Sequence, residues 1–267
     1  GLLMSAAIAM VRIDPVQSEP LELGDGTFLL GAMGHVMRVD AATGNVSWKT
    51  PFAGGMFEFR QADARPGVVY VGAEESEQTL SADQTTHPRT QTHYQAFRLA
   101  DGTEVWKRAV RFQRPMNRSI IPLSRGLVVS DGDSDKGKLL LLDYDTGESL
   151  WGNKGRGIEI AGQVLDHSFA GTDLVLTSGY DSIWTNKDTA YLLYVLDTAS
   201  GSFKFEKPFE VKGRMLGTEL TPQGLIYVTT HEINIFDPAT GGLKNAAALR
   251  SKASLAPVSD GMLVSAV

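Results

Sequence analysis

The chain has 267 residues, of which 42% are hydrophobic and 21% charged, with 28 glycines, 11 prolines and no cysteine. The missing cysteines exclude a disulfide framework, a thiolate metal site, a cysteine nucleophile and an iron–sulfur cluster. The net charge of −6 argues against general affinity for nucleic acid or anionic lipid, because both need a basic surface to neutralise phosphates.

The chain opens on a nearly apolar run over residues 1–11. The run is too short to span a bilayer and lacks the basic leader of a secretory signal. It fits either a pair of strands or the remnant of a signal region. A weak copy of the repeat described next starts inside it, at residues 8–18, and favours strands. We therefore expect no membrane span.

A repeat organises the rest of the chain. An apolar strand is followed by Asp, two residues, Thr or Ser, and Gly, and then by a second strand with an aromatic residue about four positions after the glycine. The five copies are residues 35–48, 95–106, 139–151, 193–205 and 233–245.

Each part of the repeat has a mechanical role. The Asp accepts hydrogen bonds from turn amides, and the Gly supplies the positive φ of a tight hairpin. These turn residues are Asp40, Asp143, Asp197 and Asp237, with Gly44, Gly102, Gly147, Gly201 and Gly241. The aromatic residues are predicted to pack between neighbouring units rather than to hold a cofactor; they are Trp48, Trp106, Trp151 and Phe205.

Two further strands precede each hairpin. An apolar segment lies upstream of each, at residues 26–32, 67–73, 126–132, 173–179 and 224–230, and a shorter, less regular strand lies before that. Four short strands in each repeat of 40 to 58 residues, with no helical periodicity, are the pattern of a propeller blade. The sequence predicts an all-β protein, a β-propeller of four-stranded antiparallel blades in one domain over residues 1–267.

The two ends of the chain suggest how the ring closes. Residues 253–267 supply a first and a second strand and then stop, whereas the first repeat copy lacks its first strand. Pairing of the N- and C-terminal strands would complete six blades without an open edge. The alternative is a segment of a seven- or eight-bladed propeller.

These motifs resemble the pyrroloquinoline-quinone-type propeller repeat, which occurs in quinoprotein dehydrogenases and in BamB-like proteins. The resemblance implies the architecture but not an activity, because most carriers of the repeat bind no quinone. It also implies a bacterial protein of the periplasm or the cell exterior. The expected function is a non-catalytic scaffold that binds a protein, a peptide or a small ligand through its loop-rich face.

Two enzyme hypotheses stay open. One is a quinoprotein-type oxidoreductase domain with pyrroloquinoline quinone and calcium, against which stand the missing vicinal cysteines. The other is an enzyme with its site in the central channel. No Gly-x-Ser-x-Gly elbow or dinucleotide-binding glycine motif is present, and His87 and His93 are too loosely spaced to form a zinc pair by themselves.

The candidate binding surface is the face that carries the connections between second and third strands and between blades. Two insertions lie there, at residues 74–93 and 180–188. Binding loops concentrate where a rigid scaffold presents them together, although insertions of this kind are also tolerated as surface elaboration.

Arginines are predicted in the loops between blades on the same face. Guanidinium groups at one mouth of the channel would suit an anionic small molecule or an acidic peptide. The alternative is structural pairing with Glu58, Glu159 and Glu219, which we place on or near first strands. The arginines are Arg111, Arg114, Arg118, Arg156 and Arg214.

One segment has the spacing of metal ligands. Asp131, Asp133 and Asp135 alternate as at the start of a calcium loop. The glycine comes one position late and Leu142 stands where the last ligand would be, so a polar hairpin turn is the competing interpretation.

Overall fold

The computed structural model describes residues 19–32, 34–52, 55–80, 86–112, 120–132, 136–179, 190–213, 215–237, 239–249, 253–258 and 261–266. The chain divides into two compact units. The first contains residues 1–133 and 138–158, and the second contains residues 134–137 and 159–267.

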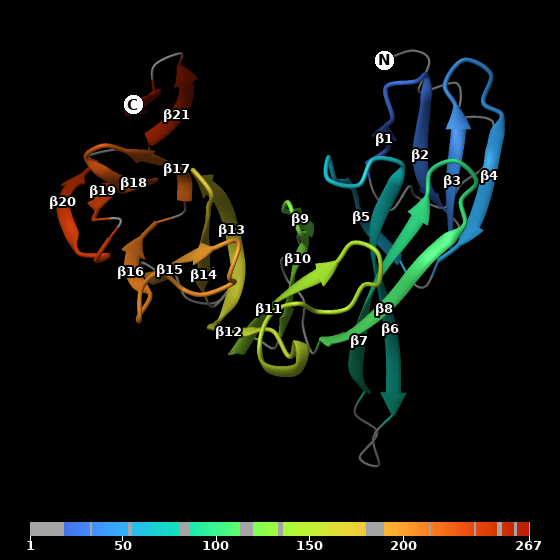
Figure 1. The fold of residues 1–267 in the computed structure, drawn as a ribbon, viewed down its shortest axis with the longest axis horizontal. Helices are drawn as coiled ribbons and strands as arrows, with labels where there is room; N and C mark the ends of the chain where they lie inside the picture. Colours follow the sequence, from blue (N-terminus) through green and yellow to red (C-terminus); the bar gives the residue numbers. More distant parts are fainter. Residues whose placement is uncertain are drawn as a thin grey trace. The chain divides into compact units, whose positions relative to one another are not determined.

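Five four-stranded antiparallel sheets follow one another along the chain, each with its strands in sequence order (Figure 1). We call them blades 1 to 5. Blade 1 contains β1 (Leu21–Glu22), β2 (Thr27–Ala32), β3 (His35–Asp40) and β4 (Val46–Pro51). Blade 2 contains β5 (Gly55–Gln61), β6 (Val68–Leu80), β7 (Thr86–Arg98) and β8 (Glu104–Phe112). Blade 3 contains β9 (Ile120–Pro122), β10 (Gly126–Gly132), β11 (Lys136–Asp143) and β12 (Ile158–Ala161).

Blades 4 and 5 lie in the second unit. Blade 4 contains β13 (Gln163–Ala170), β14 (Asp173–Gly179), β15 (Ala190–Asp197) and β16 (Phe209–Lys212). Blade 5 contains β17 (Met215–Thr221), β18 (Gly224–Thr229), β19 (Glu232–Phe236) and β20 (Leu243–Ala248). A two-stranded sheet, β21 (Ala253–Val258) with β22 (Gly261–Ala266), ends the described chain.

The predicted all-β propeller architecture is confirmed. The single helical element in the described ranges is the short 3₁₀ turn η1 (Asn153–Gly155). The C-terminal pair β21–β22 matches the two strands expected there, but the N-terminal strands of the proposed closure lie outside the described residues. Closure of a six-bladed ring therefore stays a prediction.

The repeated turns join the third and fourth strand of each blade. In blade 1, the Asp40 carboxylate accepts hydrogen bonds from the backbone N–H and the hydroxyl of Thr43, both at 2.7 Å, and Gly44 has a φ of +73°. The Asp197 carboxylate accepts in the same way from the N–H and the hydroxyl of Ser200, and the Asp237 carboxylate accepts from the N–H groups of Ala239 and Thr240. Because these hydrogen bonds favour the charged carboxylate, the pKa of each of the three lies below its ordinary value of 3.8.

The seam between blades 1 and 2 is built around Trp48. This indole is 8% exposed, and its N–H donates to the carbonyl of Leu99 in blade 2 at 2.8 Å. A Cβ on Gly102 would stand 2.4 Å from the indole, so the turn glycine of blade 2 is the surface on which the ring packs.

The seam between blades 2 and 3 repeats this geometry. The Trp106 N–H donates to the Tyr144 carbonyl at 2.8 Å, and a Cβ on Gly147 would stand 2.5 Å from the indole. At the surface, Arg65 donates from Nε and Nη2 to the two carboxylate oxygens of Asp145, at 3.0 and 2.7 Å.

Phenylalanine replaces the indole in the second unit. Phe205 packs on the turn glycine of blade 5, where a Cβ on Gly241 would stand 2.5 Å from the ring. Phe209 lies 5.2 Å from Phe205 and 4.8 Å from Phe236 between ring centroids, so three rings join blades 4 and 5. Trp151 of blade 3 is 3% exposed, and its Nε1 has no hydrogen-bond partner among the described residues.

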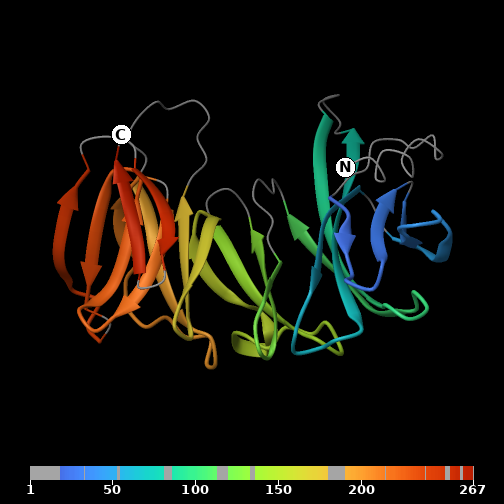
Figure 2. The ribbon, with the colours of Figure 1, turned by 90° about the horizontal axis from the view of Figure 1, so that it is seen from above.

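Two features depart from the regular repeat. The insertion at residues 74–93 is a long hairpin in which β6 and β7 pair from Val68↔Arg98 to Leu80↔Thr86, past the end of β5 at Gly55↔Glu74 (Figure 2). The fourth strand is also interrupted in blades 3 and 4, because only one isolated bridge follows each turn before β12 and β16 begin.

Replacing Trp106 with Ala removes the indole from its seam. We expect the free energy of unfolding to fall by about 3–5 kcal/mol. Trp106→Phe keeps most of the packing and loses the hydrogen bond to Tyr144, at a cost of about 1 kcal/mol. Urea denaturation measures both values. Val105→Ala is the control, because Val105 is the exposed neighbour on the same strand. Equal losses of unfolding free energy for Val105→Ala and Trp106→Ala would contradict the role of Trp106 in joining the blades.

The turn glycines separate backbone strain from contact with the indole. Gly44 and Gly147 have nearly equal φ, +73° and +69°, but only Gly147 lies against a ring. Alanine at Gly44 costs the strain of a left-handed residue, about 1–2 kcal/mol. Gly147→Ala also displaces Trp106 and is expected to cost about 1–3 kcal/mol more. Thermal unfolding compares the variants, and equal losses would show that the indole does not need the glycine.

Candidate functional site

A pocket forms where the fourth strand of blade 4 is interrupted. Phe203 makes an isolated bridge to Leu196, and the Lys204 N–H still donates to the Val195 carbonyl at 2.8 Å. Regular pairing resumes only at Phe209, opposite Leu193. Residues 205–208 therefore bulge out of the ladder and leave a recess beside β15, which we call the edge pocket.

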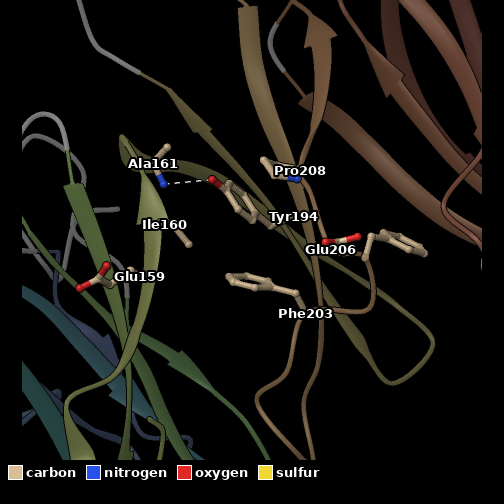
Figure 3. A pocket seen from close by; sticks show the side chains of 8 residues that line it. Glu159, Ile160, Ala161, Tyr194, Phe203, Glu206 and Pro208 are labelled. Carbon is tan, nitrogen blue, oxygen red and sulfur yellow. Dashed lines mark hydrogen bonds between the residues drawn. The ribbon is translucent and has the colours of Figure 1, made fainter. Parts of the chain in front are cut away.

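The edge pocket has a volume of about 420 Å³ and lies wholly within the second unit (Figure 3). It is lined by Glu159, Ile160, Ala161, Tyr194, Phe203, Phe205, Glu206 and Pro208. The lining comes from β12, from β15 and from the bulge, so three segments separated in sequence form one recess.

Aromatic rings form the main wall of the edge pocket. Tyr194 and Phe203 stand 5.2 Å apart between centroids at an interplanar angle of 40°. The Ala161 N–H donates to the Tyr194 hydroxyl at 3.0 Å, which fixes that ring against β12. Figure 3 shows these two rings beside each other, with Ile160 on the β12 side and Pro208 on the other.

The two charged residues that line the edge pocket are both acidic. Glu206 is exposed on the bulge, and Glu159 borders the pocket from β12 with its carboxylate pointing away from the rings (Figure 3). Neither forms an ion pair with a described residue. Lys204, which directly precedes the bulge, forms an ion pair with Asp173 at 2.6 Å, and Lys207 is not a lining residue.

The structure does not assemble the predicted arginine cluster from its described residues. Arg114, Arg118 and Arg214 lie outside the described ranges, and of Arg111 only the backbone is described, on β8 opposite Gln91. Arg156 is exposed and directly follows η1. It therefore lies inside the interrupted fourth strand of blade 3, and its predicted place in a loop between blades is wrong.

The three glutamates suggested as arginine partners have different positions. Glu58 lies on β5 and Glu219 on β17, both first strands as expected. Glu159 lies on β12, the fourth strand of blade 3, four residues before the first strand of blade 4 begins at Gln163, so it is near a first strand but not on one. The repeat misplaced Arg156 because it did not show that the fourth strand resumes after η1.

Glu58 connects the first strands of blades 2 and 3. Its carboxylate accepts a hydrogen bond from the Ile120 N–H at 2.8 Å and pairs with Arg60 at 2.5 Å. Burial raises the pKa of Glu58 above its ordinary value of 4.5, although Arg60 and the Ile120 N–H act in the opposite direction. Glu58 thus has a structural partner on its own strand.

Most of the segment predicted to bind calcium lies outside the described residues. Asp133 and Asp135 are not described, and of Asp131 only the backbone is, at the end of β10. His87 likewise has only its backbone described, on β7, where His93 is buried. Among the described residues no group of three or more His, Asp or Glu side chains could hold a metal ion. The calcium and anion hypotheses stay untested.

Sequence reasoning missed the edge pocket. A signal was available in the stretch Phe205-Glu-Lys-Pro208, where a proline interrupts a segment that should continue as a strand. The sequence alone did not show that the bulge would leave Tyr194 and Phe203 beside a cavity.

The blades, their turn motifs and their aromatic seams define a β-propeller protein of the pyrroloquinoline-quinone-like repeat type. The chain belongs to the family of the outer membrane protein assembly factor BamB, whose model matches residues 12–242. No helix in the described ranges is long and apolar enough to cross a membrane.

Several solved structures are similar to this chain. BamB from Moraxella catarrhalis is 13% identical, with 94% of this chain and 85% of that one covered and a TM-score of 0.40. The Pan2 WD40 domain of Neurospora crassa is 12% identical, with 95% and 74% covered and a TM-score of 0.48. The search of curated proteins found no matching sequence.

The raised pKa of Glu58 gives a pH dependence with a definite sign. Since the folded protein holds this proton more tightly than the unfolded chain, the contribution of Glu58 to stability is fully present below pH 4.5 and is lost as the pH rises above it. Glu58→Gln keeps an acceptor for the Ile120 N–H and removes the titration. We expect the variant to gain stability relative to the wild type between pH 4 and pH 7. Urea denaturation across this range measures the difference, and a gap that widens towards acid would contradict it.

Proposed function

We propose that this protein is a non-catalytic scaffold that binds a protein partner through its outer surface. The observation that carries the proposal is the edge pocket, in which Phe203, Phe205 and Tyr194 line a recess at an irregular strand edge. A recess lined by aromatic and acidic groups is suited to anchoring a side chain of another protein.

The use of the repeated residues supports a scaffold. The indoles of Trp48 and Trp106 and their turn glycines are engaged in holding blades together. Asp40 and its equivalents are engaged in closing the turns. The groups that recur from blade to blade thus have structural partners, and the binding function is left to the places where the repeat is broken.

The family match supports a location and a class of partner. The matched family is described as an outer membrane protein assembly factor. We propose that this chain works in the periplasm or outside the cell of a bacterium and that its partner is a protein met there. A role in assembling outer-membrane proteins is the particular form of this proposal that the family suggests.

Site-specific photo-crosslinking in cells tests the scaffold proposal. A photoreactive amino acid replaces Lys207, beside the edge pocket, or Val105 or Leu243, two exposed residues on fourth strands of blades 2 and 5. We expect a discrete adduct with another protein from Lys207, since the bulge is the proposed contact.

The other two positions keep the result interpretable. Adducts from position 105 or 243 alone would support a scaffold that binds through a different surface. Absence of a protein adduct from all three positions would overturn the proposal. Stoichiometric binding of pyrroloquinoline quinone with calcium, and substrate oxidation by the complex, would overturn it in favour of the oxidoreductase alternative.

A further inference from the structure

We propose that the edge pocket receives a basic side chain, arginine or lysine, from an extended segment of the protein partner. This inference rests on the proposed scaffold function and names the chemistry of its contact. The volume of about 420 Å³ falls within the range of roughly 300–1,000 Å³ that is usual for pockets that hold small ligands.

The aromatic wall favours a cation. Ammonium and guanidinium groups are attracted to the faces of Tyr and Phe rings within about 6 Å of the centroid. Tyr194 and Phe203 are held 5.2 Å apart, and Phe205 is fixed on Gly241, so these rings are in place before a ligand arrives. A preformed wall lowers the entropy cost of binding.

The acidic charge at the pocket favours a positively charged ligand. Glu206 is the ionisable side chain on the bulge that lines the pocket, and it has no ion-pair partner among the described residues. The nearby ammonium group of Lys204 is already neutralised by Asp173. A carboxylate without a counter-ion beside aromatic rings complements an incoming guanidinium or ammonium and repels an anion.

The remaining lining suits the rest of the incoming residue. Ile160 and Pro208 offer apolar surface for the methylene stem of an arginine or lysine. The Tyr194 oxygen accepts the hydrogen bond from the Ala161 N–H, and its own O–H hydrogen stays available to donate to a carbonyl of the incoming backbone. This second contact favours a peptide over a free cation.

Titration with small probes tests the chemistry on the full chain. The probes are capped pentapeptides of alanine with a central arginine, lysine or norleucine, and binding is followed by chemical-shift changes of the amides around residues 194–208. We expect saturable shifts with the arginine and lysine peptides and weaker binding of the norleucine peptide. Free guanidinium should bind more weakly than the arginine peptide.

Two variants and one control locate the contact. Glu206→Gln should weaken binding of the arginine peptide by about two- to fivefold, because it removes an exposed charge pair. Phe203→Leu should also weaken binding of the arginine peptide by about two- to fivefold, because it removes a cation–π contact. Glu210→Gln makes the same chemical change at an exposed position on β16 outside the pocket, and it should leave binding unchanged.

The outcomes separate this inference from the scaffold proposal. Equal binding of the norleucine and lysine peptides, equal losses at positions 206 and 210, equal affinity for free guanidinium, or no binding of any probe would each overturn it. Melting temperatures identify a variant that loses affinity by unfolding, in which case Glu206→Asp replaces it. Protein adducts that persist in cells while the basic peptides fail would refute the basic side chain and leave the scaffold standing.

Discussion

The fold depends on the packing of an aromatic side chain from the fourth strand of one blade against the turn glycine of the next. Trp48 and Gly102, Trp106 and Gly147, and Phe205 and Gly241 are three instances of this contact. It works because glycine alone lets a ring approach the turn backbone this closely, and because the indole N–H then reaches a carbonyl beside the turn. In these three places the turn motif closes its own hairpin and also receives an aromatic side chain of the preceding blade.

The edge pocket forms in blade 4, where the contact between the ring and the turn glycine is kept but the fourth strand is interrupted. Phe205 keeps its place on Gly241, whereas residues 205–208 leave the ladder with β15 and regular pairing resumes only at Phe209. The seam contact is therefore kept while the outer edge of the blade is interrupted, and the recess lies beside packed aromatic side chains. An irregular edge on a regular scaffold is a common way for a repeat protein to gain a specific binding site.

The sign of the charge at the pocket differs from the one that the arginines suggested. From the sequence, the arginines indicated either an anionic ligand or structural pairing with glutamates, but Arg156 lies between η1 and β12, inside blade 3. The pocket instead carries Glu206 without a described counter-ion. The two hypotheses concern different surfaces, and each stays open to its own test.

The sequence by itself determined the blade and its turn chemistry, because these depend on local patterns: apolar runs in the strands, Asp and Thr that bond turn amides, and a glycine at positive φ. It also identified the aromatic positions of the repeat. Only the tertiary structure decided that the insertion at residues 74–93 is a long hairpin, that the fourth strands of blades 3 and 4 are interrupted, and that Tyr194, Phe203 and Glu206 line one recess. These features depend on which backbone groups find partners across strands, and that competition between segments far apart in the chain leaves no periodic signal in the sequence.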